Sequence, residues 1–305
     1  TIPCEMWIRD SSRPVAANGV ASVLADLQLE DVQVRDSRGA HPGNPVGVRL
    51  DTGERPPADA EEANAAAAAL AAGAFGEAAQ QAVAPFPRRA RSLSAVTWAI
   101  RAPASGLELA RHNVFFSADY PAEFETLTRA RAMPDDPTIY LCAQDRALPE
   151  DPTGLGPQRL LALINAPADG DDRPLSRSEI DACQTRVFQR LARHGLMLAS
   201  TPETQTITTP QDFNALFPKT GGALYGRATH GWAAAFQRPA ATTALPGLYL
   251  AGGSAHPGAG VPMAALSGRI AASAILKRLA STSISRPAAT PGGTWTPSAT
   301  TADTV

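Results

Sequence analysis

The residue types best suited to binding chemistry gather near the C-terminal end of the sequence, in the stretch PGLYLAGGSAHPGAGVPMAALSGRIAASAIL at residues 246–276. The apolar run Leu248 to Ala251 predicts a short buried strand. Gly252 and Gly253 follow it directly, and because glycine has no Cβ atom, a ligand can approach the backbone closely there. The strand and its two glycines therefore predict one side of a ligand site.

A second pair of glycines, Gly258 and Gly260, precedes a predicted helix from Val261 to Leu279. Pro262 stands near the first helical position, where proline is favoured. The unpaired N–H groups of a helix start carry about half a positive charge, which suits a phosphate group or a flavin carbonyl. A tight turn between a strand and a helix needs only two glycines, whereas this turn has four, together with His256 and two prolines. The excess favours ligand binding over a plain turn.

These residues must be positioned by an α/β scaffold, which the hydrophobic patterns of the remaining chain predict. Strands are expected where β-branched and apolar residues alternate or run together, at 32–35, 46–50, 94–100, 113–117, 138–143 and 160–165. Helices are expected at 13–30, 63–83, 121–132 and 176–194. The last of these is amphipathic, and Ser176 with Glu179 predicts a capping box at its start. The order of the elements indicates a mixed-sheet domain over roughly residues 90–235.

Composition limits the classes of function. The chain has 305 residues, of which 44% are hydrophobic and 18% charged, as in a globular protein with a substantial core. The net charge of -2 gives no basic footprint, so no nucleic-acid partner is expected. The cysteines Cys4, Cys142 and Cys183 lie far apart, and neither a zinc site nor a disulfide framework is predicted. No apolar run reaches the roughly 20 residues of a membrane-spanning helix.

The stretch HPGAGVPMAALSGR at 256–269 closely resembles the C-terminal FAD-binding motif of the bacterial phytoene desaturase family of FAD-dependent carotenoid oxidoreductases. Within that family it is most similar to the acyclic hydroxycarotenoid (hydroxyneurosporene or methoxyneurosporene) 3,4-desaturases. Four other segments agree and come in the family's order: SLSAVTWAIRA at 92–102, RHNVFFSADYPAEFETL at 111–127, DPTIYLCAQDR at 136–146 and GGALYGRATHGWAAAFQRP at 221–239. The similarity spans roughly residues 45–278.

The resemblance implies a flavoenzyme of the α/β class, with an incomplete Rossmann-like FAD-binding domain and an inserted mixed-sheet substrate domain. The implied divisions are a partial FAD-binding segment at 1–90, a substrate-binding domain at 91–235 and a C-terminal FAD-binding segment at 236–280. The composition of residues 281–305 predicts a disordered tail. The implied cofactor is FAD, and the residues expected to face it are Gly252, Gly253, His256, Gly258, Gly260, Val261, Pro262 and Met263.

The implied activity is oxidation of a CH–CH bond of a carotenoid, in which a hydride passes to flavin N5 and a proton is lost. The substrate would be an acyclic 1-hydroxycarotenoid such as hydroxyneurosporene, and no catalytic side chain is predicted. His230, Trp232, Asp119 and Tyr120 are expected to bind it, although the last two could instead be a helix start and a core aromatic. Because carotenoids dissolve in the bilayer, the implied location is cytoplasmic, with peripheral attachment to the surface of the inner membrane.

Two departures from the family pattern stand out. No GxGxxG fingerprint occurs in residues 1–60, where the family places the turn that holds the FAD pyrophosphate. The stretch DAEEANAA at 59–66 keeps Asn64, but it puts Glu61 and Glu62 in a strand that should be buried, which predicts a damaged or exposed strand. We therefore expect only the C-terminal portion of such an enzyme, with weak hold on FAD by itself. The alternatives are a phytoene desaturase and an inactive, non-catalytic remnant.

Overall fold

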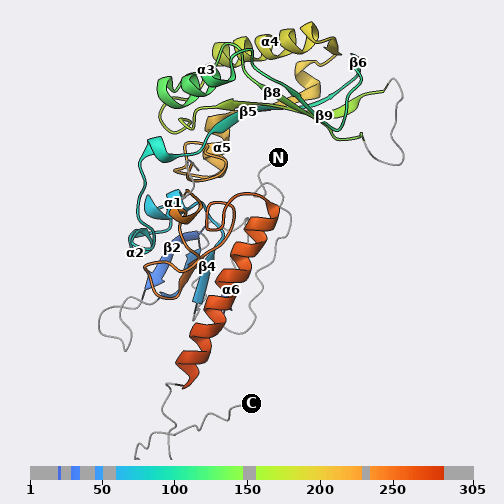
Figure 1. Cartoon of the computed structure of the whole chain (residues 1–305). Helices are drawn as coiled ribbons and strands as arrows, with labels where there is room; N and C mark the ends of the chain where they lie inside the picture. The colour runs from blue at the N-terminus through green and yellow to red at the C-terminus, as the bar shows by residue number, and fades with distance from the viewer. Residues whose placement is uncertain are drawn as a thin grey trace, which may run out of the picture.

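The computed structural model describes residues 60–146, 156–228 and 234–284, together with three strands at 20–21, 29–34 and 45–50. These residues form a mixed α/β protein with two main sheets of different kinds. A five-stranded sheet lies at one end, and a smaller parallel sheet with a long helix lies at the other (Figure 1). The expected fold class, a mixture of helices and sheets, is confirmed.

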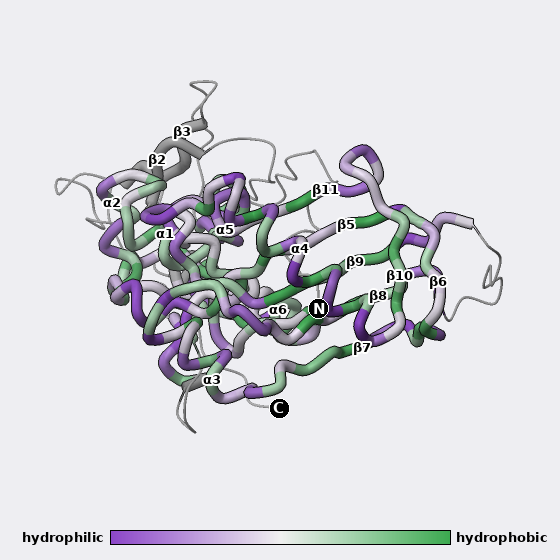
Figure 2. Tube along the Cα trace, turned by 90° about the horizontal axis from the view of Figure 1, so that it is seen from above, coloured by the Kyte–Doolittle hydropathy of each residue, from purple (hydrophilic) through white to green (hydrophobic). Residues whose placement is uncertain are grey.

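The larger sheet is antiparallel throughout, with the strand order β11-β5-β9-β8-β7. Its strands are β5 (Ser94–Ala102), β7 (His112–Phe115), β8 (Ile139–Ala143), β9 (Gln158–Ala166) and β11 (Gln205–Thr208). Along β9, buried residues alternate with more exposed ones, because successive side chains of a strand point to opposite faces. Figure 2 shows hydrophobic stretches running side by side through β5, β9 and β8.

Helices and short strands surround this sheet. The helical elements are α3 (Tyr120–Glu125), the π-helical η3 (Thr126–Ala130), α4 (Arg177–Arg193), α5 (Pro210–Leu216) and the 3-10 turns η2 (Arg88–Ala90), η4 (Pro202–Thr204) and η5 (Ala234–Gln237). Strands β6 (Ala104–Gly106) and β10 (Leu196–Leu198) form a small antiparallel pair. The predicted capping box is present: Ser176 Oγ accepts from the Glu179 amide, and the Glu179 carboxylate accepts from the Ser176 amide.

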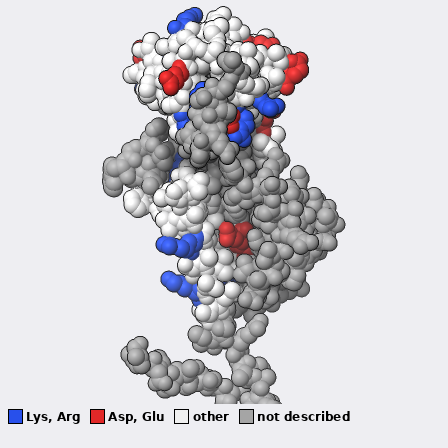
Figure 3. Space-filling model, turned by 90° about the vertical axis from the view of Figure 1, so that its right-hand side faces the viewer, with Lys and Arg blue, Asp and Glu red and all other residues white. Residues whose placement is uncertain are grey.

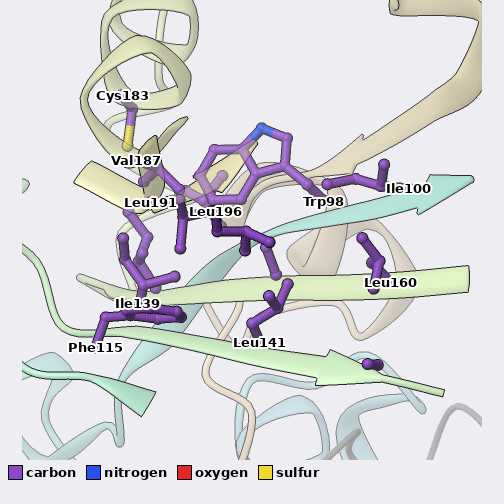
Figure 4. Close-up of a cluster of buried hydrophobic side chains, with 14 of the residues drawn as sticks. Trp98, Ile100, Phe115, Ile139, Leu141, Leu160, Cys183, Val187, Leu191 and Leu196 are labelled. Carbon is purple, nitrogen blue, oxygen red and sulfur yellow. The ribbon is translucent and has the colours of Figure 1, made fainter. Parts of the chain in front are cut away.

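The main hydrophobic core lies between α4 and one face of the larger sheet. Cys183, Val187 and Leu191 of α4 are buried against this face (Figure 4). Trp98 of β5 is fully buried, and its indole N–H donates to Gln184 Oε1 of α4 over 3.3 Å. The helix is therefore fixed to the sheet both by apolar packing and by a directional hydrogen bond.

The smaller sheet is parallel, with the order β1-β4-β12. Its elements are β1 (Val20–Ala21), β4 (Ala60–Ala63), α1 (Ala67–Ala71), α2 (Glu77–Gln80), β12 (Leu248–Leu250) and α6 (Val261–Ile284), beside a separate antiparallel pair of β2 (Leu29–Val34) and β3 (Pro45–Leu50). Leu248 and Leu250 pack toward α1 and α2, whereas Tyr249 packs toward α6. The sheet is thus covered on both faces, as parallel sheets require.

Most predicted elements are confirmed within a few residues of their expected ends. The predicted strands all appear, and the helices expected at 121–132, 176–194 and 261–279 are α3 with η3, α4 and α6. The helix expected at 63–83 is divided into α1 and α2, because Gly73 and Gly76 adopt φ angles of +76° and +90° that interrupt it.

Three expectations were wrong in part. The helix predicted at 13–30 is contradicted where it is described, since Val20–Ala21 pairs with β4 as a strand and β2 begins at Leu29. Strand pairing overrides the local helical spacing there. The strand expected to be damaged or exposed is β4, the central strand of its sheet, with Glu61 only 3% exposed. Helix α6 continues to Ile284, so the predicted tail begins later, and residues 285–305 lie outside the described residues.

A last observation concerns membranes. Within the described ranges, none of the helices combines the length and apolar character needed to cross a bilayer.

Candidate functional site

The carboxyl ends of two parallel strands, far apart in the sequence, meet at the glycine-rich turn. Leu250 of β12 pairs with Ala63 of β4, and the Ala251 amide donates to the Ala63 carbonyl over 3.2 Å. Beyond them, Gly252 lies beside Asn64, and a Cβ atom on Gly252 would stand 2.4 Å from Asn64 Oδ1. Gly252 also has a φ of +103°, which favours glycine. Ligands of open α/β sheets bind beyond such strand ends, so this edge is the candidate site.

Two buried serines hold the turn in place. Ser267 of α6 accepts a hydrogen bond from the Gly252 amide over 2.7 Å, and it is fully buried. Ser254 accepts from the Ala67 amide at the start of α1 over 3.3 Å and donates to the Ala65 carbonyl over 3.2 Å. The turn is therefore anchored to the helix that follows β4 and to the helix that follows β12.

The second glycine pair lies directly before the first turn of α6 and leaves open space beside it. Gly258 and Gly260 have φ angles of +147° and +104°, and a Cβ atom on Gly260 would meet no atom within 4 Å. The side chains of Val261 and Met263 are exposed, and their amides have no hydrogen-bond acceptor among the described residues. Free amides beside open space fit an anionic or carbonyl group. The free amides and the open space at the start of α6 are therefore the features that fit a phosphate or a ring carbonyl of a flavin nucleotide.

A buried arginine lies under the turn and was not among the expected site residues. Arg238 is 6% exposed, and its guanidinium donates to the carbonyls of Tyr225 (2.8 Å), Gly253 (2.9 Å) and Arg227 (3.3 Å). Burial lowers the pKa of this guanidinium from its usual value. The signal in the sequence was a single cation in the small and apolar stretch AAAFQRPAA. Local sequence patterns do not reveal its three carbonyl partners, because they come from two segments, 225–227 and the turn at Gly253, that only the folded chain brings together.

His256, a further expected cofactor residue, lies on the outer side of the same turn. Its ring stacks on Phe236 with 6.2 Å between ring centroids, and its amide donates to the Pro239 carbonyl over 2.8 Å. The structure thus brings the expected glycines, His256, Val261, Pro262 and Met263 into one continuous turn and helix start.

The expected substrate residues are not brought to this turn. Asp119 caps α3, where its carboxylate accepts from the Ala122 amide over 3.0 Å. Tyr120 belongs to an exposed aromatic cluster with Phe116 and Phe124, at ring-centroid distances of 5.9 and 4.9 Å. The geometry therefore supports the alternative for Asp119, a helix start, whereas Tyr120 is a surface aromatic rather than a core one. His230 and Trp232 lie outside the described residues.

The face of the larger sheet that lies away from α4 is partly covered by α5, whose Phe213 packs in a cluster with Ala95 and Leu163 of the sheet. Leu163 pairs with Thr97 and Tyr140 in one row across this face, and all three are half-buried. The neighbouring row contains Leu161 and Cys142. In Figure 1 this face is turned toward the part of the molecule that contains α6, and α5 lies between them. The structure therefore provides a surface of mixed polarity, partly covered by α5, on the side of the sheet that faces the smaller sheet.

Polar groups at the edge of this face pair with one another. His112 Nδ1 lies 2.7 Å from Tyr140 Oη on the adjacent strand. Burial, together with neighbouring Cys142, raises the pKa of Tyr140 to about 12, so its hydroxyl keeps its proton near neutral pH. In the described residues, no group of histidine, cysteine or acidic side chains could hold a metal ion.

Comparison with protein families and curated proteins gives consistent matches. Residues 45–276 match the family of flavin containing amine oxidoreductases. A hydroxyneurosporene desaturase from Rubrivivax gelatinosus is 50% identical over 275 residues, which are 89% of this chain and 50% of that protein. One from Cereibacter sphaeroides is 46% identical over 241 residues, 79% of this chain and 48% of that protein. A 1-hydroxycarotenoid 3,4-desaturase from a Flavobacterium species is 31% identical over 192 residues, 62% and 38% respectively.

The chain spans about half the length of the curated relatives it matches most fully. Among solved structures, MibH, a tryptophan 5-halogenase, aligns with a TM-score of 0.33 and 13% identity, over 82% of this chain and 34% of that chain. A TM-score this low does not establish a shared fold. The expected resemblance to hydroxycarotenoid desaturases is confirmed, and so is the flavin cofactor at the level of the family. With a family match over residues 45–276, the chain belongs to the flavin containing amine oxidoreductases.

Proposed function

We propose that this chain is the C-terminal part of an FAD-dependent carotenoid desaturase that acts on an acyclic 1-hydroxycarotenoid such as hydroxyneurosporene. The observation that carries the proposal is the anchored turn of four glycines between β12 and α6, which leaves open space and free amides at the helix start. The 50% identity to a hydroxyneurosporene desaturase supports the choice of substrate.

The reaction removes two hydrogens across a C–C bond of the substrate. One would leave as a hydride accepted by a bound flavin and the other as a proton, and the electron pair of the C–H bond that loses the proton would form the new C=C bond. The flavin supplies the redox step when bound, while the protein supplies binding, orientation and exclusion of water. The residues proposed to contact the cofactor are Gly252, Gly253, His256, Gly258, Gly260, Val261, Pro262 and Met263.

The substrate is proposed to lie against the face of the larger sheet that is turned away from α4, beside the part that α5 covers. Leu161 and Ala99 are apolar residues on this uncovered part, and they match a hydrocarbon chain. The opposite face is occupied by the core under α4 and is closed to a ligand. In Figure 1 the face turned away from α4 looks toward the part of the molecule that contains α6, so a polyene on its uncovered part would lie on the same side of the sheet as the glycine-rich turn.

Access to such a substrate requires contact with a membrane surface, and we propose peripheral attachment on the cytoplasmic side of the inner membrane. Phe116 is 63% exposed and forms a cluster with Tyr120 and Phe124. Aromatic side chains of this kind prefer the bilayer interface. On the side of the molecule that Figure 3 shows, which is opposite to α3, charged side chains are scattered over the described surface. The attachment is therefore proposed to rest on apolar contact through the aromatic cluster.

The test uses the full-length protein reconstituted with FAD. Liposomes loaded with 1-hydroxyneurosporene or with phytoene are incubated with it, and the shift of product absorption to longer wavelength is recorded. We expect conversion of the hydroxycarotenoid. Conversion of phytoene alone would replace the substrate assignment by that of a phytoene desaturase.

A pair of variants tests whether the glycine-rich turn at 252–260, called the cofactor turn from here on, holds the flavin. Gly260→Val forces a β-branched residue into a φ of +104° and should abolish flavin retention. Gly268→Ala, eight residues further along the chain and with open space around its Cβ position, should retain it. If the wild-type protein binds no FAD and converts neither substrate, the enzyme assignment fails and the inactive remnant takes its place.

A further inference from the structure

We infer that Arg238 is a positioning residue of the flavin site, which locks the cofactor turn to the substrate domain and places a fixed positive charge beside the cofactor. The inference rests on the proposed flavin site. It adds a residue that the glycine-rich motif does not contain, and it assigns that residue an effect on the reduction of the flavin.

The hydrogen bonds of Arg238 join two parts of the molecule. Two of its carbonyl partners, Tyr225 and Arg227, belong to the segment that returns from the substrate domain, whereas the third, Gly253, belongs to the cofactor turn. The returning segment is itself fixed to the larger sheet, because the Ser92 amide, just before β5, donates to the Gly226 carbonyl over 2.8 Å. Arg238 therefore links the sheet that would hold the substrate to the turn that would hold the flavin.

The environment of Arg238 leaves its charge without a neutralising carboxylate. Among the described residues no Asp or Glu forms an ion pair with its guanidinium, and its hydrogen-bond partners are carbonyl dipoles. Burying a cation in this way is unfavourable unless something anionic lies nearby. Arg238 also lies against the second glycine pair, because a Cβ atom on Gly258 would stand 3.5 Å from Arg238 Nε, so its charge is beside the turn that is proposed to hold the flavin.

The flavin supplies the missing negative charge at one stage of the reaction. Transfer of a hydride, which carries two electrons and one proton, adds one negative charge to a neutral oxidised flavin. A fixed cation beside the ring system stabilises this reduced form more than the oxidised form, since only the former is charged. Arg238 should therefore raise the midpoint potential of the bound flavin and favour hydride transfer from the substrate.

The experiment measures the flavin potential in the full-length holoprotein by equilibration with reference dyes. Arg238→Met removes the charge and the hydrogen bonds, and Arg238→Lys keeps the charge but loses the planar guanidinium. We expect Arg238→Met to shift the equilibrium of flavin reduction at least tenfold toward the oxidised form, which is about 30 mV for a two-electron couple. Arg238→Lys should recover most of the potential. The matched control is Arg269→Met, an exposed arginine of α6, whose potential should equal that of the wild type.

The outcomes separate the inference from the proposed function. If the wild type binds flavin and converts the carotenoid, but Arg238→Met and Arg238→Lys both have the wild-type potential, Arg238 is only structural and the inference is wrong. If Arg238→Met does not retain flavin, the neutral variant Arg238→Gln, isolated with excess FAD, decides: a shift of at least tenfold toward the oxidised form supports the electrostatic role, and the wild-type potential refutes it. A wild type without flavin refutes the proposed function itself.

Discussion

Glycine at position 252 is required by the backbone of the cofactor turn more than by the space around it. Its φ of +103° is strained for any residue with a Cβ atom, at a cost of about 1–3 kcal/mol. An alanine Cβ would also lie 2.4 Å from Asn64 Oδ1. Because this oxygen is at the end of a flexible side chain, a rotation of Asn64 relieves the contact. We therefore expect Gly252→Ala to lower the free energy of unfolding by about 1–3 kcal/mol, mainly through the backbone.

Urea unfolding of the full-length protein measures this loss as a lower midpoint with an unchanged slope. The control is Gly268→Ala, whose added Cβ meets nothing within 4 Å in the middle of α6, and it should raise stability by about 0.5–1 kcal/mol. The double variant Asn64→Ala/Gly252→Ala removes the contact and leaves the φ angle unchanged. It should remain about as unstable as Gly252→Ala. Full recovery in the double variant, or wild-type stability of Gly252→Ala, would refute the argument from the backbone.

Three further predictions concern other parts of the molecule. Ser176→Ala removes one half of the capping box of α4 and should lower the free energy of unfolding by about 1 kcal/mol in the same urea assay. The control Ser273→Ala changes an exposed serine in the interior of α6 and should have little effect. The pKa of Tyr140 is raised to about 12, so the native state binds its proton more tightly than the unfolded chain does. The free energy of unfolding should therefore be constant below about pH 10 and fall between about pH 10 and 12, as tyrosinate absorbance and urea unfolding at each pH would show. Tyr140→Phe should remove that part of the fall. Phe116→Ser should reduce the fraction of protein that sediments with liposomes. Met197→Ser, which changes a similarly exposed apolar residue on β10, should leave that fraction unchanged. Equal reductions in both variants would argue against the aromatic cluster as the attachment point.

Sequence patterns predicted those elements whose own residues determine them. The apolar run of β9 and the spacing of Ile180, Cys183, Val187 and Leu191 in α4 are local signals, and both elements were found where expected. The capping box and the cap at Asp119 are also local, because donor and acceptor are three residues apart. The glycine-rich turn belongs to the same class, since glycines at strained φ angles appear directly in the sequence.

The failures come from long-range contacts. Residues 20–21 have a helical context, but the edge of β4 offers them strand pairing. Glu61 was expected to disrupt β4, yet the strand is held by β12 on one side and β1 on the other. Arg238 was missed because its three carbonyl partners belong to segments whose proximity only the folded chain creates. No local window contains that information.

The connection between the two sheets affects how the protein folds. Ser254 and Ala65, which meet at the cofactor turn, are 189 positions apart in the chain. The segment between them, which contains the larger sheet, closes on itself where Ser92 bonds to Gly226. If that segment folds first, the loop that must still be closed to join β4 and β12 falls from 189 to about 55 flexible residues, which lowers the entropic cost of closure by about 1 kcal/mol. The glycine-rich turn would then assemble last, as a late and non-local step, and during refolding probes in the larger sheet should recover before probes in the turn.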